Sequence, residues 1–247
     1  MRYANALVTG ASSGLGRGLA ALLARHGVRV YAAARRTALL DALKTEAGDS
    51  IVPVELDVSD ADRTHDRVRE IDEECGGLDL VVANAGVGEE TYGKRLRWDS
   101  VHRIIDVNVT GAAATLAGAI PGMVARGRGH LVGTSSIAAF AALPRMSAYC
   151  ASKAFLATFL ASLRLDLKPL GITVTTLHPG FVKTEMTAKN RFPMPFLMEA
   201  DAAVERIWKG IEAGEEVVAF PWQMVAAIKA VAALPRPFAE AAFRRLG

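Results

Sequence analysis

Short apolar runs alternate with longer stretches of helical periodicity along most of the chain. The apolar runs have the length and composition of strands buried on both faces, and they cover residues 5–9, 28–34, 51–56, 78–83, 130–135 and 172–177. Helical periodicity lies between them, most clearly over residues 60–74, 98–126 and 146–167. Strands that alternate with helices predict a parallel, doubly wound α/β sheet, which binds ligands at the carboxyl ends of its strands.

Length and composition are those of one α/β domain over residues 1–247. The chain is 51% hydrophobic and 22% charged, which suits a globular protein with a large core. Cys75 and Cys150 form neither a disulfide framework nor a metal-ligand cluster, so we expect no metal. A net charge of +3 requires no nucleic-acid partner. With no signal peptide expected before the first strand and no apolar run of the ~20 residues that span a bilayer, we expect a cytoplasmic protein.

A glycine-rich turn follows the first strand. Its sequence is Gly-Ala-Ser-Ser-Gly-Leu-Gly over residues 10–16, and a helical stretch comes next. Glycines allow a tight turn and a close approach of the backbone to a ligand, and the free N–H groups of a helix N-terminus bind pyrophosphate. The spacing differs from the Gly-x-Gly-x-x-Gly pattern. Its position between the first strand and a helix nevertheless favours a dinucleotide site.

The end of the second strand bears on which dinucleotide is bound. Folds that prefer NAD usually place an acidic residue there to hold the ribose hydroxyls. In this chain Ala34 takes that place, and Arg35 and Arg36 follow it. Guanidinium groups suit a 2′-phosphate, so the sequence favours NADP(H). The alternative is that the two arginines form an ordinary solvated helix start.

Polar and small residues also follow the later strands. Asp57 comes after the third strand. Its chemistry fits two roles equally well: a contact with the adenine amino group, or a cap of a turn or helix. Asn84-Ala85-Gly86 follows the fourth strand and is small enough to let backbone approach a cofactor. Asn108 lies inside an apolar helical run, where an asparagine is usually a satisfied core amide but also holds a kink or an ordered water.

Tyr149 and Lys153 are candidates for acid–base chemistry. They lie four residues apart and therefore on one face of the predicted helix 146–167. An ammonium beside a phenol favours the phenolate, so we expect the pKa of Tyr149 to lie below its usual ~10. Ser136 follows the fifth strand and brings a hydroxyl that can bond the same substrate oxygen. The alternative is a chance pair, since Tyr-x-x-x-Lys occurs in many helices.

Together these segments resemble the short-chain dehydrogenase/reductase family over about residues 4–187. The resemblance is carried by Thr9 to Gly16, Asn84 to Gly86, Asn108, Ser136, Tyr149 to Lys153, and Pro179-Gly180. It implies a three-layer Rossmann fold with strand order 3-2-1-4-5-6-7. It also implies a catalytic tetrad in which Tyr149 is the acid/base and Ser136 positions the substrate oxygen. Lys153 would bind the nicotinamide ribose and tune Tyr149, and Asn108 would support a water in the proton relay.

The resemblance also implies a set of cofactor contacts. They are Gly10, Ser12, Ser13, Gly14, Leu15, Gly16, Arg35, Arg36, Asp57, Val58, Asn84, Ala85, Gly86, Tyr149, Lys153, Pro179, Gly180, Val182 and Thr184. NADP-preferring members often carry a basic residue where this chain has Ser13. We therefore expect Arg35 to do most of the 2′-phosphate binding, with help from Arg36, Thr37 or Ser12.

Two segments near the C-terminal end vary most in this family. Residues 181–200 form the expected substrate lid, whose Phe192, Met194, Phe196 and Leu197 either line an apolar pocket or pack the lid onto the body. Residues 222–247 form a tail with a single charge, Lys229, before residue 235. Three positions for the tail stay open: against the core, in a dimer interface, or on a bilayer surface. The resemblance implies a homodimer or homotetramer.

These expectations combine into an NADP(H)-dependent oxidoreductase. Its substrate would be a small-molecule ketone or aldehyde that is interconverted with its alcohol, and the apolar side chains of the lid favour a lipophilic one. A ketoacyl-thioester reductase is the first alternative, disfavoured because the tail lacks a Gly-Gly strand segment. A non-catalytic NADP-sensing protein is the second, disfavoured because the tetrad is complete. His178 is expected to end a strand and not to act as a second base.

Overall fold

The computed structural model describes residues 3–189 and 193–244. In these residues seven parallel strands form one sheet in the order β3-β2-β1-β4-β5-β6-β7, as expected. The strands are β1 (Asn5–Thr9), β2 (Arg29–Ala34), β3 (Ile51–Glu55), β4 (Leu80–Ala83), β5 (Gly129–Thr134), β6 (Ile172–Pro179) and β7 (Val217–Phe220). Phe192 of the expected lid and Arg245 and Leu246 of the tail lie outside the described residues.

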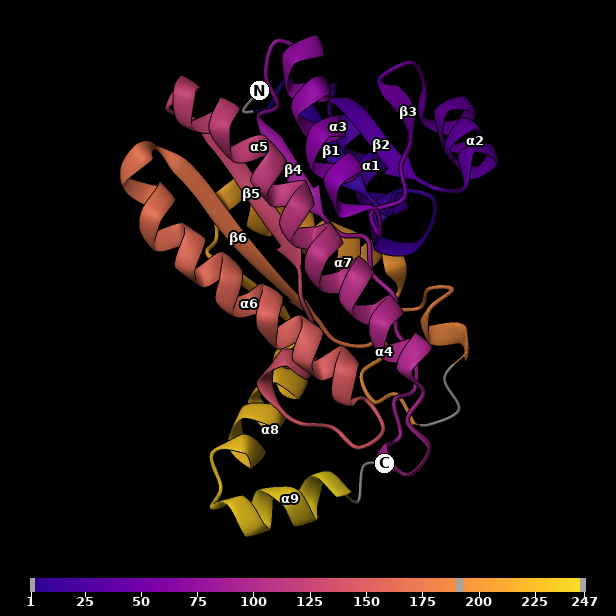
Figure 1. Cartoon of the computed structure of the whole chain (residues 1–247), viewed down its shortest axis with the longest axis vertical. Coiled ribbons are helices and arrows are strands. Elements are labelled where there is room, and N and C mark those ends of the chain that lie inside the picture. Colours follow the sequence, from indigo (N-terminus) through magenta and orange to yellow (C-terminus); the bar gives the residue numbers. More distant parts are fainter. Residues whose placement is uncertain (1–2, 190–192, 245–247) are drawn as a thin grey trace.

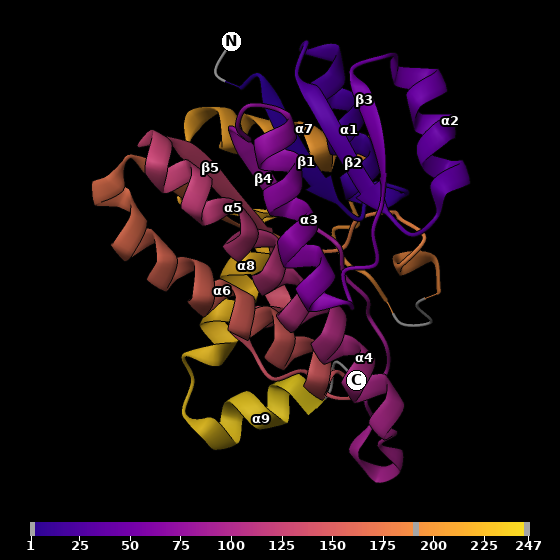
Figure 2. The same ribbon diagram turned by 45° about the horizontal axis from the view of Figure 1, so that its top comes forward.

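Helices cover both faces of the sheet (Figures 1 and 2). They are α1 (Gly14–Arg25), α2 (Thr37–Ala47), α3 (Ala61–Glu74), α4 (Trp98–Ile105), α5 (Ala112–Arg126), α6 (Ser147–Leu167), α7 (Ala200–Ala213), α8 (Trp222–Ala232) and α9 (Arg236–Arg244). Residues of α1, α2 and α7 form the apolar core with one face. Residues of α3, α5 and α6 form the core with the other face. The three-layer α/β/α architecture is therefore confirmed.

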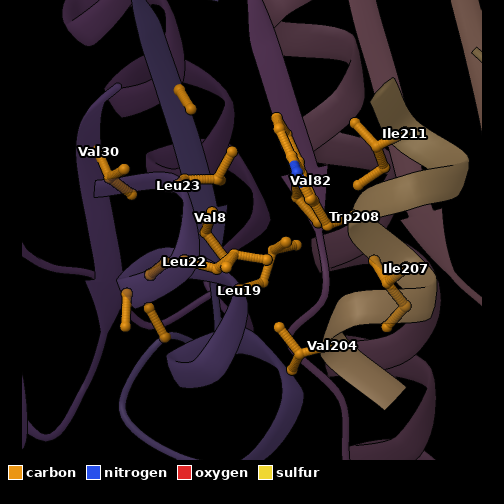
Figure 3. Packing of buried hydrophobic residues seen from close by; sticks show 14 of the residues in the cluster. Val8, Leu19, Leu22, Leu23, Val30, Val82, Val204, Ile207, Trp208 and Ile211 are labelled. Atoms are coloured by element: carbon orange, nitrogen blue, oxygen red, sulfur yellow. The ribbon is translucent and has the colours of Figure 1, made fainter. Parts of the chain in front are cut away.

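The strands read as continuous apolar runs because both of their faces are buried. Successive side chains of a strand point to opposite faces. Val8 of β1 accordingly joins one core cluster, while its neighbour Leu7 joins the other. Figure 3 shows Val8 with Leu22 of α1 and Trp208 of α7 in the first of these clusters.

The predicted helix over residues 98–126 is interrupted. The segment Asp106–Gly111 between α4 and α5 is π-helical, a feature that often marks functional sites. Gly111 has no Cβ, and a Cβ there would clash with the Val58 carbonyl. Among the described residues, Trp98–Arg126 is also the one helical run long and apolar enough to cross a membrane, contrary to our expectation of none. Half of its apolar window is buried, as in the core helix of a globular fold.

Helix α6 offers a matched test of the core. Leu160 is fully buried, and a Cβ at Gly133 of β5 would clash with it, whereas Leu165 on the same helix is 77% exposed. We expect Leu160→Ala to lower the free energy of unfolding by about 2–5 kcal/mol. Leu165→Ala should change it by less than about 0.5 kcal/mol. Urea denaturation followed by circular dichroism measures both, and equal losses would contradict the packing described for α6.

Candidate active site

The glycine-rich turn packs closely against the end of β4. Gly10 and Gly14 have φ values of +69° and +55°, in the left-handed region that favours glycine. A Cβ at Gly10 would lie 2.8 Å from Cα of Ala85, and one at Gly16 would clash with the Gly10 carbonyl. Helix α1 starts within this turn, so its first backbone N–H groups face the carboxyl end of the sheet.

Thr9 and Asn84 hold the ends of β1 and β4 together. The Thr9 hydroxyl accepts the backbone N–H groups of Asn84 and Ala85 at 3.0 and 3.1 Å. In return, the Asn84 side-chain amide donates to the Thr9 carbonyl at 3.0 Å. Asn84 therefore joins the ends of the two central strands, and it packs beneath the glycine-rich turn.

Arg36, and not Arg35, reaches the glycine-rich turn. Its guanidinium donates to the Ser12 hydroxyl at 3.1 and 3.2 Å and to the Ser13 hydroxyl at 2.7 Å. It also pairs with Glu185 at 2.9 Å. Arg35 turns the other way and lies 3.4 Å from Asp57. The geometry thus differs from our expectation that Arg35 would do most of the 2′-phosphate binding. The reason is that neighbouring side chains after a strand point in different directions.

Asp57 has the geometry of a turn residue. One of its carboxylate oxygens accepts the backbone N–H of Ser59 at 3.0 Å and the Ser59 hydroxyl at 2.8 Å. Burial alone would raise the pKa of Asp57, but the Ser59 hydrogen bonds and the Arg35 guanidinium outweigh it and lower that pKa. These contacts fit the alternative that Asp57 is a turn residue. Its second carboxylate oxygen faces the Arg35 guanidinium.

Ser136 is held at the end of β5 by three neighbours. Its hydroxyl caps the short 3-10 helix Ile137–Phe140 by accepting the Ala138 N–H at 3.1 Å, and it donates to the Pro179 carbonyl at 3.4 Å. The Ser136 carbonyl accepts a hydrogen bond from Nδ1 of His178 at 3.0 Å. Burial lowers the pKa of His178, so this ring is neutral near pH 7. It positions Ser136, in agreement with its prediction as a strand-end residue.

Tyr149 and Lys153 lie one turn apart at the start of α6. Nζ of Lys153 lies 5.7 Å from the centroid of the Tyr149 ring and donates to the Thr134 carbonyl at 2.8 Å. Burial lowers the pKa of Lys153 to about 8. Burial also raises the pKa of the Tyr149 phenol, opposed by its hydrogen bond with Ser136. Our expectation of a lowered Tyr149 pKa is therefore wrong, because burial outweighs the hydrogen bond with Ser136 and the Lys153 amine donates to the Thr134 carbonyl.

Asn108 joins three elements from inside the π-helical segment. It is fully buried. Its side-chain oxygen accepts the Val87 N–H at 2.8 Å, and its amide nitrogen donates to the Val87 carbonyl at 2.9 Å and to the Ser152 hydroxyl at 3.1 Å. A Cβ at Gly86 would lie 3.4 Å from this oxygen and 3.3 Å from Nζ of Lys153. The loop after β4 thus brings Asn108 and Lys153 to the same place.

The comparisons with known proteins agree with this arrangement. A family model described as short chain dehydrogenase matches residues 4–194. The chain belongs to the short-chain dehydrogenase/reductase family. It is 59% identical over 249 residues to an uncharacterized oxidoreductase of Myxococcus xanthus, covering 100% of this chain and 98% of the relative. The chain is thus an oxidoreductase of this family.

Two solved structures are similar to this dehydrogenase/reductase. A short-chain dehydrogenase from Sphingobium yanoikuyae in complex with NADPH has a TM-score of 0.82 and 29% identity, covering 92% of this chain and 91% of that one. A 3-ketoacyl-(acyl-carrier-protein) reductase from Brucella melitensis complexed with NADH has a TM-score of 0.79 and 26% identity, covering 87% of this chain and 95% of that one.

The segment after β6 closes this dehydrogenase/reductase site from the side of the glycine-rich turn. A Cβ at Gly14 would lie 3.3 Å from the Thr184 methyl group. Gly180 donates its N–H to the Phe220 carbonyl at 2.7 Å. Val182 is buried in the core, so its side chain contributes packing. The predicted lid brings Met186 near Tyr149, because a Cβ at Gly88 would lie 3.6 Å from the Met186 sulfur and 3.7 Å from Cε2 of Tyr149.

Three supporting residues were missed from the sequence. Ser152 accepts from Asn108 and donates to the Tyr149 carbonyl at 2.8 Å. The Ser135 hydroxyl donates to the Lys153 carbonyl at 2.7 Å, and Thr134 accepts from the Lys153 amine. The signal in the sequence was their hydroxyl side chains, which stand before the Tyr149–Lys153 segment (Thr134 and Ser135) and within it (Ser152).

A separate cavity of about 340 Å³ lies between α1, α7 and residues 183–184 and contains none of the tetrad side chains. Charged side chains of both signs line it, among them Arg17, Glu46, Lys183 and Asp201. Arg17 and Glu46 form an ion pair there. The cavity is therefore separate from the candidate active site around Tyr149.

Burial of Lys153 predicts a dependence of stability on pH. Its pKa is about 8 in the folded chain and 10.5 as the ordinary value. Between these values the unfolded chain binds more protons, so the free energy of unfolding rises with pH. Lys153→Met removes this rise. We expect the stability of this variant relative to the wild type to fall by at most about 1.4 kcal/mol per pH unit above pH 8. Urea midpoints between pH 7 and pH 10 measure it, and a constant difference would contradict a lowered pKa.

Proposed function

We propose that the chain is an NADP(H)-dependent carbonyl reductase that interconverts a ketone or aldehyde with its alcohol. The observation that carries this proposal is the meeting of Ser136, Tyr149, Lys153 and Asn108 at the carboxyl ends of β4 and β5. A phenol hydrogen-bonded to a serine hydroxyl, with a buried amine one turn away, is equipped to exchange a proton with a carbonyl oxygen.

The residues present fit a dinucleotide that carries a 2′-phosphate. The turn at Gly10 and Gly16 leaves no space for side chains, which suits close approach of a pyrophosphate to the backbone. Arg36 lies over the Ser12 and Ser13 hydroxyls and supplies a planar set of donors for a phosphate. Ala34 stands where NAD-preferring folds usually have a carboxylate that binds the ribose hydroxyls.

The two solved neighbours carry different nicotinamide cofactors by their descriptions, NADPH in one and NADH in the other. Family membership therefore does not decide between the two for this chain. The preference for NADP(H) rests on Arg36, Ser12 and Ser13.

When bound, the nicotinamide supplies or accepts the hydride at the substrate carbon. The chain's own residues handle the proton and the geometry. Ser136 and Tyr149 both bond the substrate oxygen, and Tyr149 transfers its proton to it in the direction of reduction. The raised pKa of Tyr149 keeps the phenol protonated near pH 7, which is the form that donates. The pKa of Lys153, about 8, lies close enough to pH 7 for its amine to exchange a proton as well.

Asn108 acts by fixing the loop after β4. Its two hydrogen bonds to Val87 hold the backbone beside Gly86, and its bond to Ser152 ties that loop to the Tyr149 turn of α6. This arrangement keeps the phenol and the amine at a constant separation. In the proposed mechanism Asn108 also supports a water in the proton relay.

We propose a lipophilic substrate because the expected lid carries apolar side chains, one of them close to Tyr149. Met186 lies beside Tyr149 across Gly88, and Phe196 and Leu197 of the lid are 54% and 36% exposed. A ketoacyl thioester is the second candidate, since the Brucella melitensis neighbour is a 3-ketoacyl-(acyl-carrier-protein) reductase. A panel that compares free lipophilic ketones with acetoacetyl thioesters separates these two substrates.

Replacing the phenol tests the proton transfer. Tyr149→Phe removes only the hydroxyl, so we expect kcat to fall about 10²–10⁴-fold or more. The affinity for NADPH should change less than about threefold, since the hydroxyl bonds Ser136 and, in the proposed mechanism, the substrate oxygen. Turnover is measured by NADPH absorbance with the panel above, and affinity by titration calorimetry. Wild-type turnover in this variant would overturn the assignment of Tyr149.

The two neighbouring arginines provide a matched pair for the cofactor preference. Arg36→Ala should weaken NADPH binding about 10–100-fold, because it removes charge-assisted hydrogen bonds worth about 1.5–3 kcal/mol. NADH binding should be unchanged, since NADH lacks the 2′-phosphate. Arg35→Ala is the control and should weaken NADPH binding much less, because Arg35 lies against Asp57. A larger effect at Arg35, or a loss that is equal for both cofactors, would contradict the role of Arg36.

A further inference from the structure

The tail, residues 222–247, exposes large apolar side chains. Trp222 is 73% exposed, Phe238 is 66% exposed and Leu234 is 46% exposed. Helix α8 has Met224 as its one buried residue, and α9 is attached through Ala239 and Phe243. Isolated exposed apolar residues are ordinary, but several large ones on α8, on α9 and in the turn between them mark an interaction surface.

The tail also carries the net positive charge of the chain. Its sequence has four basic residues (Lys229, Arg236, Arg244 and Arg245) and one acidic residue, Glu240, so its formal charge equals the +3 of the whole protein. Glu240 accepts from both Arg236 and Arg244, at 2.9 and 3.3 Å. Residues 1–221 are therefore neutral overall, and the excess charge lies beside the exposed apolar side chains.

A second patch of the same character lies at the same end of the molecule. It is the segment Tyr92–Trp98, in which Leu96 is 53% exposed and Trp98 is 68% exposed. Lys94, Arg95 and Arg97 alternate with these side chains in the sequence. Figures 1 and 2 both place the start of α4 and helix α9 at the same end, beyond the carboxyl ends of the strands.

We propose that this end of the molecule docks on the surface of an anionic lipid bilayer. Tryptophan and phenylalanine side chains settle at the headgroup level, and lysine and arginine bind headgroup phosphates. Helix α8 has 11 residues and is about 16 Å long at the usual helical rise, which is too short to cross a hydrocarbon core of about 30 Å. A peripheral position parallel to the surface is the arrangement that fits.

Charge favours a lipid surface over a second copy of the chain. A two-fold symmetric contact brings the same patch of both copies together. Two tails of +3 would then face each other, and like charges in an interface are costly. An anionic surface instead pairs with Arg236 and Arg244, whose side chains are 90% and 76% exposed, while accepting Trp222 and Phe238. Each cation near such a surface contributes about 1 kcal/mol, which is about fivefold in binding.

Vesicle sedimentation of the full chain tests this proposal without reference to activity. We expect binding to phosphatidylcholine vesicles that contain phosphatidylglycerol, weakened by salt, and at least about tenfold less binding to phosphatidylcholine alone. The double variant Trp222→Ser, Phe238→Ser should lose at least about tenfold of the binding. Arg236→Gln with Arg244→Gln should lose it selectively for the anionic vesicles, because both side chains are exposed on α9.

Leu165→Ser is the matched control, because Leu165 is a 77% exposed apolar residue on α6, outside both patches. Thermal unfolding by circular dichroism checks that every variant folds like the wild type. Absence of binding to anionic vesicles, equal binding to both vesicle types, or an equal loss in Leu165→Ser would each overturn the proposal. So would a wild-type oligomer that the double variant dissociates in the absence of any vesicle binding, since a second copy would then cover this surface. These readouts do not involve the cofactor, so they stand or fall separately from the proposed reaction.

Discussion

The buried amine of Lys153 is the constraint on which the site depends. The side chain is 4% exposed, and a charged group at such a position is costly unless it is paired or hydrogen-bonded. The Thr134 carbonyl accepts from it, and the Ser135 hydroxyl donates back to the Lys153 carbonyl. These two bonds tie the end of β5 to the first turns of α6. Since Ser136 follows directly on β5 and Tyr149 lies one turn before Lys153, the same bonds set how the serine and the phenol face each other.

The irregular backbone around this junction has a common cause. Parallel strands deliver their carboxyl ends to one edge, where helices must separate to admit ligands. The π-helical segment Asp106–Gly111 turns Asn108 inward, and its amide replaces backbone partners for Val87 after β4 ends. Gly86 and Gly111 permit the close approaches that result. The site is therefore rigid through side-chain bonds to backbone and needs no continuous secondary structure.

Sequence patterns predict those parts of the structure that depend on local composition. Apolar runs located the strands because both sheet faces are buried, and family motifs pointed to four residues that the structure brings close together. The direction in which each side chain points was harder to predict. Arg35 and Arg36 are neighbours with the same chemistry, and only the path of the chain after β2 decides that Arg36 faces Ser12 while Arg35 faces Asp57. The spacing likewise placed Lys153 one turn from Tyr149, but it gave no sign that the amine would donate to the Thr134 carbonyl. It also gave no sign that burial would raise the pKa of the Tyr149 phenol.

The tail shows why an exposed surface and a buried site are connected in this fold. Nζ of Lys229 in α8 lies 4.9 Å from the centroid of the Phe140 ring. Phe140 in turn stacks on His178 at 4.5 Å, and His178 donates to the Ser136 carbonyl. The backbone of Ser136 is thus supported, through two aromatic rings, by a helix whose other side faces solvent. Because each contact in this series is a packed one, a displacement of α8 must be taken up at Phe140 before it reaches the serine. Met224 of the same helix lies against Gly180, where a Cβ would be 3.3 Å from its sulfur, so α8 supports the expected cofactor segment after β6 as well as Ser136.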